Sequence, residues 1–579
     1  MDKDEFERIE KSLLSKNHML TLSLEDSAFE RIDQTLKDNN FEHVEELKFA
    51  SKMKERENIA SFFSHLLKFS NLETFSVAMF DLSVEEAVLE QLLSFLKQAK
   101  ALRSLTFDCN DTSPEELNVT LLKHLAENTT LERLVISNLN HNCKGKVEEI
   151  IRKNNSLKSM KVHFLHLELT SLIQMHQMLK ENTTLHTFKA TCSSLTLFFG
   201  QKLQIPSKIS LKKLILKHCH LFDESDEFAL HDFLRENKSL CSLVIQDTLR
   251  DKQLKEVLEG VQGSSSLCSL VLKQVIVKDG SLLGDFLREN KSLTEFEVTS
   301  GGSDMYRSIY RAMKLNSTLK SLKLSQTRGE SSQLITEMIV CNSNLTEISI
   351  RGDVSANGTG EVFEALKSNK SVQVFKISTS LVNRMLDSAS IVDCLNSNKV
   401  LKELEIVSLD FDQVYLRNLF SALEKNQTIT SLRIGNFVGG SDLLNEFSGM
   451  ISKNKKIKNL SFFLGRVPSV NETPLIEALS SNFSITSLCI GRKKEGRAEE
   501  IVQENRLIHK RDQSAKRLLL SLRARKDGNV VSMIPRRLLI YLLSFLDGVK
   551  FDRQALFARK RRAEEVKEEE GESKKRRLI

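Results

Sequence analysis

The stretch that decides the fold is Leu319-Lys320-Ser321-Leu322-Lys323-Leu324, because close copies of it recur along the chain. The alternation of apolar and polar residues at its end predicts a short strand with one buried face. Apolar residues open this pattern at intervals of 26 to 30 residues, at Leu72, Leu102, Leu131, Leu157, Leu185, Leu211, Leu240, Leu267, Leu293, Leu319, Leu345, Val372, Leu401, Ile429, Ile457 and Ile485. Val44 and Leu20 extend the series toward the N-terminus. Such regularity predicts a repeat array.

The segment before each of these first positions has helical spacing. Leu121, Leu122 and Leu125 illustrate it, since together they would bury one helix face. An Asn stands three residues before 12 of the 14 first positions from Leu131 onward, Asn128 being an example. Asn tolerates the left-handed conformation that ends many helices, and its amide can bond to free main-chain groups. We therefore expect each repeat to be a helix, an Asn turn and a strand.

A unit of this length, with L-x-x-L-x-L after a helix that ends in L-x-x-N, resembles the leucine-rich repeats of ribonuclease-inhibitor-like proteins. The resemblance covers residues 20–496 and implies an α/β solenoid, with parallel strands on the concave face and helices on the convex face. The first, fourth and sixth positions should then point into the core. The chain departs from the family about eight residues after the first position, where Asn or Cys is usual and where this chain has Leu139, Cys219, Thr248, Val275, Gly301, Thr327 and Asp353.

The sequence predicts five successive regions. They are an N-terminal capping helix (1–16), a solenoid of about 17 repeats (17–497), a basic C-terminal cap (498–531), an apolar helical segment (532–558) and a basic tail (559–579). Positive charge gathers after the repeats: residues 506–579 hold 21 Lys and Arg against 10 Asp and Glu, in a chain whose net charge is +7. This asymmetry separates the array from the three C-terminal regions.

The residues between the buried positions of each strand should face the concave surface. At the fifth position, three consecutive repeats carry apolar residues, and two positions later they carry long polar ones: Ile215, Lys217, Val244, Gln246, Val271 and Lys273. An apolar stripe with a polar rim is typical of a protein-binding site. The alternative is that β-branched residues stand there only because they favour strands. The other fifth positions are mixed and mildly basic, without the aromatic series that would indicate nucleic acid.

The apolar segment begins with a Pro at a helix start and carries paired leucines: Pro535, Leu538, Leu539, Leu542, Leu543 and Leu546. It resembles the first half of an F-box and the end of a SOCS box, although an F-box Trp and a SOCS-type Cys are missing. Both resemblances imply docking to a cullin-ligase adaptor. The alternative is a further helix that caps the open end of the array.

Two basic clusters lie near the C-terminus: Lys560, Arg561 and Arg562, and then Lys574, Lys575, Arg576 and Arg577. Their spacing resembles a bipartite nuclear localisation signal, which implies a nuclear import receptor as a partner. The alternative is a solvated run of charge.

The N-terminus lacks the features of a signal peptide, and the longest apolar run has nine residues (538–546), where about 20 are needed to span a bilayer. The nine cysteines form no C-x-x-C pair, as in proteins of a reducing compartment. We therefore expect a cytoplasmic or nuclear protein without membrane contact. The sequons at Asn128, Asn182, Asn237 and Asn290 then predict turn chemistry and not glycosylation.

No phosphate-binding loop, H-E-x-x-H or paired zinc spacing is present. Cys109 is expected to be structural, and His218, His220 and His231 to be surface residues and not a metal site. We expect neither catalysis nor a cofactor or metal. The predicted function is an intracellular scaffold that binds a protein ligand on its concave face. The alternatives are the substrate receptor of a cullin-type ubiquitin ligase and a GTPase-activating protein of the Ran type.

Overall fold

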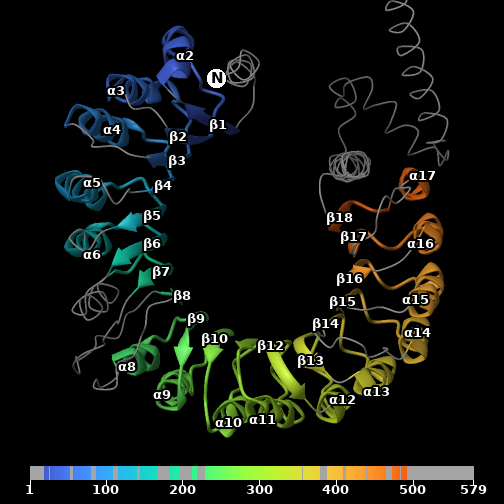
Figure 1. Ribbon diagram of the computed structural model, residues 1–579. Helices are drawn as coiled ribbons and strands as arrows, with labels where there is room; N and C mark the ends of the chain where they lie inside the picture. Colours follow the sequence, from blue (N-terminus) through green and yellow to red (C-terminus); the bar gives the residue numbers. More distant parts are fainter. Residues whose placement is uncertain are drawn as a thin grey trace, which may run out of the picture.

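The chain forms a horseshoe in which strands line the inner side and helices the outer side (Figure 1). This computed structural model describes residues 19–24, 26–51, 56–79, 86–108, 115–139, 144–166, 182–194, 211–217, 229–330, 332–354, 356–378, 388–407, 413–437, 441–464, 473–482 and 484–491. The predicted N-terminal capping helix, C-terminal cap, apolar segment and basic tail lie outside the described residues.

Eighteen strands make up the sheet within these ranges. They are β1 (Met19–Leu24), β2 (Glu46–Ser51), β3 (Thr74–Met79), β4 (Ser104–Asp108), β5 (Arg133–Leu139), β6 (Ser159–His166), β7 (Thr187–Ser194), β8 (Lys213–Lys217), β9 (Ser242–Leu249), β10 (Ser269–Val275), β11 (Glu295–Thr299), β12 (Ser321–Glu330), β13 (Glu347–Val354), β14 (Val374–Ser378), β15 (Glu403–Val407), β16 (Ser431–Phe437), β17 (Asn459–Leu464) and β18 (Ser487–Gly491).

In most of the described repeats a helix lies between one strand and the next. These helices are α2 (Asp26–Asp38), α3 (Arg56–His65), α4 (Glu86–Gln98), α5 (Glu115–Glu127), α6 (Lys144–Lys153), α8 (Ala229–Glu236), α9 (Asp251–Val261), α10 (Ser281–Glu289), α11 (Ser303–Met313), α12 (Ser332–Cys341), α13 (Ala356–Ser368), α14 (Ser388–Ser397), α15 (Gln413–Lys425), α16 (Ser441–Lys453) and α17 (Thr473–Ser481), with a 3₁₀ turn, η1 (Leu66–Lys68).

Every strand pairs in parallel with the strands that precede and follow it in the chain. The repeat sets the register: Leu322 of β12 is opposite Ile348 of β13, which is opposite Phe375 of β14. Equivalent positions of successive repeats therefore form continuous rows across the sheet. The predicted α/β solenoid, with strands inside and helices outside, is confirmed.

The core lies between the sheet and the helices. Leu319, Leu322 and Leu324 stand at the first, fourth and sixth positions of one repeat, and each is 0% exposed. Most of the intervening residues of the strands are partly exposed, which gives an alternating burial pattern such as that of β9. The core positions predicted from the alternation are therefore confirmed, since each repeat buries its apolar face against its neighbours.

The asparagines before the strands form a ladder along the array. In Asn154 the side-chain oxygen accepts hydrogen bonds from the main-chain N–H groups of Ser156 and Leu157, both at 2.9 Å. Its amide donates to the carbonyl oxygens of Leu125 and Asn128 in the preceding repeat, at 3.0 and 2.7 Å. The ladder missing eight residues after the first position is thus replaced by one at the ends of the helices.

The described turn asparagines do not adopt the left-handed conformation that Asn tolerates. Asn290 has an extended main chain, with φ −69° and ψ 130°. Among the described residues, the non-glycine residues with positive φ are Asn138, Gln274 and Ser300, each seven residues after a first position and thus at the end of a strand. The helices end without a left-handed residue because the Asn side chain itself bonds the main-chain groups that such a residue would otherwise bring together.

The asparagines of the sequons serve this turn, as the sequence predicted. The oxygen of Asn182 accepts from the N–H groups of Thr184 and Leu185, and that of Asn290 from Ser292 and Leu293. Both side chains are buried, at 4% and 7% exposure.

Candidate protein-binding surface

The six residues predicted for the concave site occupy equivalent positions on three neighbouring strands: Ile215 and Lys217 on β8, Val244 and Gln246 on β9, and Val271 and Lys273 on β10. All six are partly exposed. Ile215 is opposite Val244, which is opposite Val271, and the polar residues follow in the same order. We call Ile215, Val244 and Val271 the apolar stripe.

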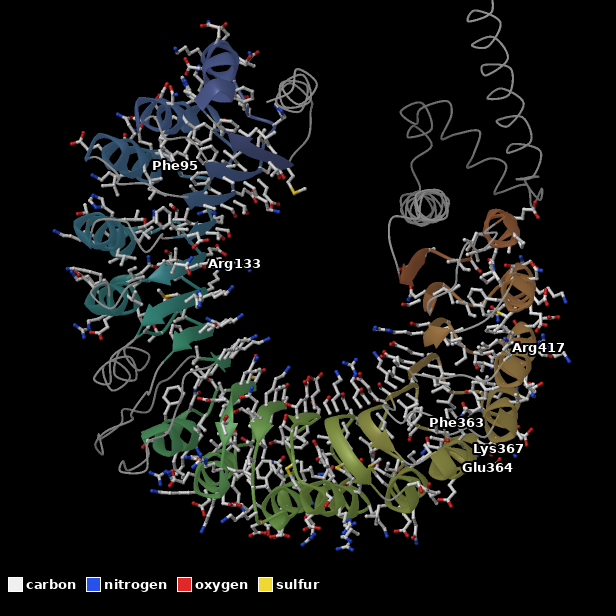
Figure 2. The ribbon with its side chains drawn as sticks, in the orientation of Figure 1. Phe95, Arg133, Phe363, Glu364, Lys367 and Arg417 are labelled. Atoms are coloured by element: carbon white, nitrogen blue, oxygen red, sulfur yellow. The ribbon has the colours of Figure 1, made fainter. Side chains whose placement is uncertain are left out.

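The stripe faces the interior of the horseshoe because its neighbours in each strand face the other way. Leu243 and Ile245, on either side of Val244, are fully buried in the core. Figure 2 shows the side chains of the strands projecting into the space that the horseshoe encloses. The stripe is therefore apolar surface on a face that the described part of the chain leaves uncovered.

The polar rim of the stripe is partly engaged in ion pairing. Lys273 lies 3.4 Å from the carboxylate of Glu297 on β11, the next strand. The apolar stripe ends at this pair, because Glu297 is the residue that follows Val271 in the same row. The end of the stripe toward β7 is different, because the row continues there with Lys189.

Beyond β10 the concave face carries paired charges. Lys323 lies 3.3 Å from Glu347, and Lys376 lies 2.7 Å from Glu403. These pairs join side chains on adjacent strands, so each lysine has a carboxylate beside it. The face is therefore locally neutral along these strands.

Glu405 of β15 is the most buried acid of this group, at 7% exposure. Arg351 of β13 and Arg433 of β16 approach it from opposite sides, at 3.7 and 3.8 Å. These two guanidinium groups offset the negative charge of one partly desolvated carboxylate.

On strands β5 to β8 the concave face is basic. Strands β5 to β8 contain five Lys and Arg residues and no Asp or Glu: Arg133, Lys161, Lys189, Lys213 and Lys217. Figure 2 shows Arg133 on the inner side of the horseshoe. We call these five residues the basic patch.

The basic patch was not predicted from the sequence. The expected charge of the concave face came only from the fifth position of each repeat, which includes Lys161 and Lys189. Taken over the whole array, the residues at this position predict only a mildly basic face. Arg133 and Lys213 stand at the third position and Lys217 at the seventh. Reading all three concave positions of each strand together would have revealed that the positive charge is concentrated.

Two cysteines lie at the edge of the candidate surface. Cys241 and Cys268 directly follow the first positions of neighbouring repeats, and both are exposed. The N–H of Cys268 donates to the carbonyl oxygen of Cys241 at 2.9 Å, so the two residues occupy the same place on adjacent repeats.

Several residues singled out from the sequence lie outside the described ranges. They are Cys109, His218 and His220, the apolar segment with Pro535, Leu538, Leu539, Leu542, Leu543 and Leu546, and the basic clusters at 560–562 and 574–577. His231 lies on α8. Among the described residues, no three His, Cys, Asp or Glu side chains are grouped to hold a metal ion. No helix in these ranges is both long and apolar enough to cross a bilayer.

Neither a protein-family model nor a curated protein matches this chain. Among solved structures, a TLR13-ssRNA13 complex matches with a TM-score of 0.42 and 13% identity over 84% of this chain and 74% of its own. Leiomodin-1 actin-binding site 2 matches with a TM-score of 0.22 and 16% identity over 33% of this chain and 96% of its own. Both scores are too low to carry an argument. The repeats, their parallel strands and their convex helices are what define this chain as an α/β leucine-rich-repeat solenoid.

Proposed function

We propose that this protein is a scaffold that binds a protein partner on its concave face, with the apolar stripe at the centre of the contact. The observation that carries the proposal is the stripe itself: Ile215, Val244 and Val271 form one row on adjacent strands and remain partly exposed. Contiguous apolar surface with a polar rim is the usual arrangement of a protein interface.

The construction of the surface supports binding by side chains on a rigid support. Each strand beneath the stripe is hydrogen-bonded on both sides, because β9 pairs with β8 and with β10. A partner therefore cannot add a strand there and must contact the side chains. Side chains held on a sheet lose little further freedom on binding, which favours affinity. The proposed function is therefore binding alone, without catalysis.

A pair of valine substitutions tests the site. Val244→Asp places a charge in the middle of the stripe, whereas Val340→Asp makes the same change at an exposed residue of α12, on the convex side, which is 62% exposed. The full-length protein and both variants are used for affinity capture, and binding of each captured protein is then measured with purified components.

A partner that binds the wild type and Val340→Asp but not Val244→Asp supports the concave site. If the partners bind Val244→Asp as well as the wild type, the proposed site is wrong. Circular dichroism of the two variants verifies that the array remains folded.

A finer form of the proposal makes the protein the substrate receptor of a cullin-type ubiquitin ligase. Its support is the sequence of residues 534–547, which resembles F-box and SOCS-box helices and carries paired leucines after Pro535. The array would then select the target, and this segment would dock the ligase adaptor. In a pull-down, Skp1-like or elongin-like adaptors should accompany the wild type and be lost from Leu539→Asp/Leu542→Asp. Absence of these adaptors from the wild-type sample would remove this form of the proposal.

We also propose that the repeats are of the ribonuclease-inhibitor-like class. A unit of 26 to 30 residues with a helix on the convex side supports the ribonuclease-inhibitor-like class. The alternative function, GTPase activation of the Ran type, would rest on that class alone. Two features of the sequence speak against this alternative. The chain has no distinctive arginine placement, and the stretch after the repeats is basic, where this alternative would call for an acidic one.

A further inference from the structure

The basic patch brings like charges together on adjacent strands. Lys161 of β6 is directly opposite Lys189 of β7, and Lys217 of β8 is opposite Thr191, two residues beyond Lys189. Neighbouring strands are about 4.8 Å apart, so the stems of these lysines are close neighbours. Like charges in opposed positions of a sheet are destabilising, and strands β5 to β8 themselves hold no acidic residue beside Lys161 and Lys189.

The effect of this crowding is concentrated at Lys189. Burial lowers the pKa of this ammonium group, and the neighbouring positive charges of Lys161 and Lys217 lower it further. A lysine in this environment gains more from an incoming anion than a fully solvated lysine does, because both burial and repulsion oppose its charge.

The rest of the face shows that such crowding is particular to this part of the molecule. Lys323 and Lys376 occupy the same fifth position on β12 and β14, and each has a glutamate of the next strand within ion-pair distance, Glu347 at 3.3 Å and Glu403 at 2.7 Å. The array therefore places a carboxylate beside its concave lysines in one region and omits it in the other.

We propose that the basic patch binds an acidic segment of the protein partner, next to the apolar residues that this segment places on the stripe. The inference rests on the proposed function and deepens it, because it specifies the chemistry of the ligand. Lys161, Lys189, Ile215, Val244 and Val271 follow one another in a single row across five strands.

The geometry of that row defines the spacing within the ligand. From Lys189 to Val244 is two strand intervals, about 10 Å, which an extended peptide covers with about three residues. The ligand segment therefore carries one or two acidic residues, followed or preceded about three residues away by an apolar side chain.

A protein segment fits this surface better than a nucleic acid. The inward-facing positions of β5 to β8 hold no Phe, Tyr or Trp, which are the side chains on which single-stranded bases stack. The positive row also ends after two lysines and continues with apolar side chains and then Glu297. A nucleic acid, with a phosphate at every nucleotide, would require basic side chains to continue along its path.

The test is a selection of phage-displayed random peptides, about twelve residues long so that they can cross the row, on the full-length protein and two variants. Lys161→Gln/Lys189→Gln removes the two opposed lysines, which form no ion pair with any residue that the structure describes. Lys323→Gln/Lys376→Gln removes two lysines at the same position of other repeats and serves as the matched control. All four side chains are partly exposed, and melting curves verify the fold of each variant.

We expect the wild type and the control variant to select peptides enriched in Asp or Glu about three residues from an apolar side chain. Lys161→Gln/Lys189→Gln should lose the acidic enrichment and bind a synthetic copy of the selected peptide about tenfold more weakly at low salt, with a flatter salt dependence. Equal acidic enrichment on this variant, or none on the wild type, overturns the inference.

Two further outcomes separate this inference from the proposed function. Selected peptides that depend on Val244 but not on Lys161 and Lys189 would leave the concave scaffold standing and refute the acidic ligand. Peptides insensitive to Val244→Asp would refute both. Tighter binding of a single-stranded oligouridine probe than of the selected peptide, lost in Lys161→Gln/Lys189→Gln, would assign the patch to nucleic acid and also overturn the inference.

Discussion

The side-chain amide nitrogen of Asn342 lies 2.6 Å from the carbonyl oxygen of Met313, the last residue of α11 in the preceding repeat. The same amide donates to Asn316, and its oxygen accepts from the N–H groups of Asn344 and Leu345, each at 2.9 Å. One buried side chain thus ends one helix, shapes the turn into the next strand and joins two repeats. Asn454 makes the same contacts with Leu423 and its own turn.

Replacing Asn342 should destabilise the array at this interface. Asn342→Ala leaves two carbonyl groups and two N–H groups without their partners in a buried turn, and we expect a loss of roughly 2–4 kcal/mol in the free energy of unfolding. Asn342→Asp should be at least as damaging, because its carboxylate would face the carbonyl oxygens of Met313 and Asn316. Urea denaturation followed by circular dichroism measures both effects.

Ser343 provides the control for this measurement. It is exposed in the same turn, and Ser343→Ala should change the free energy of unfolding by no more than about 0.5 kcal/mol. An effect of Asn342→Ala as small as that of Ser343→Ala would show that the ladder contributes nothing to stability.

Glu256 of α9 should make the stability depend on pH. Burial raises the pKa of this carboxyl from its ordinary 4.5 to about 7, with Lys252 opposing the rise and Glu259 adding to it. Its Oε2 atom is buried without a hydrogen-bond partner among the described residues. Because the pKa is higher in the folded state, the stabilising contribution is complete below about pH 4.5 and is lost as the pH rises through about 7.

Glu256→Gln should remove this dependence. We expect the variant to melt at a higher temperature than the wild type at pH 8, and the two proteins to approach each other near pH 5. Glu259→Gln, on the same helix with a side chain that is 48% exposed, removes only the charge that adds to the rise, so it should move the loss of stability to a slightly lower pH without abolishing it. Parallel wild-type and Glu256→Gln profiles would contradict the assignment.

The cysteines should differ strongly in reactivity. Burial raises the pKa of the Cys394 thiol to about 12, whereas Cys241, Cys268 and Cys341 are exposed. Alkylation with iodoacetamide at pH 8, followed by mass spectrometry, should modify these three well before Cys394, because the thiolate is the reactive form. A bound partner should shield Cys241 and Cys268 at the edge of the stripe but not Cys341 on the convex side. Equal shielding of Cys341 would argue against a concave contact.

The C-terminal basic clusters should direct nuclear import. Residues 559–579, fused to a reporter too large to diffuse through the nuclear pore, should accumulate in the nucleus of transfected cells. Replacing Lys560, Arg561 and Arg562 by Ala should abolish the accumulation, and replacing Glu568 and Glu569 should not. A cytoplasmic wild-type fusion would show that the clusters are not a localisation signal.

The periodic part of the structure could be predicted because its cause is local. Burial of Leu322 and Leu324 follows from alternation within one strand, and the apolar stripe follows from comparing equivalent positions of Ile215, Val244 and Val271. These inferences need only the repeat length, because parallel strands of identical repeats come into register. The turn asparagines were also identified, but their bond to the preceding repeat was not, since nothing within one repeat shows that Asn342 reaches the carbonyl of Met313.

The sequence by itself determined the solenoid, the identity of its core positions and the place of the stripe, because each depends on a pattern that repeats along the chain. Only the tertiary structure decided which charges compensate one another. Arg351 reaches Glu405 across an intervening strand, while Lys161 and Lys189 stand together without a carboxylate in their strands. Electrostatic and hydrogen-bond energies depend on distance through space, and that distance is fixed only when the repeats stack.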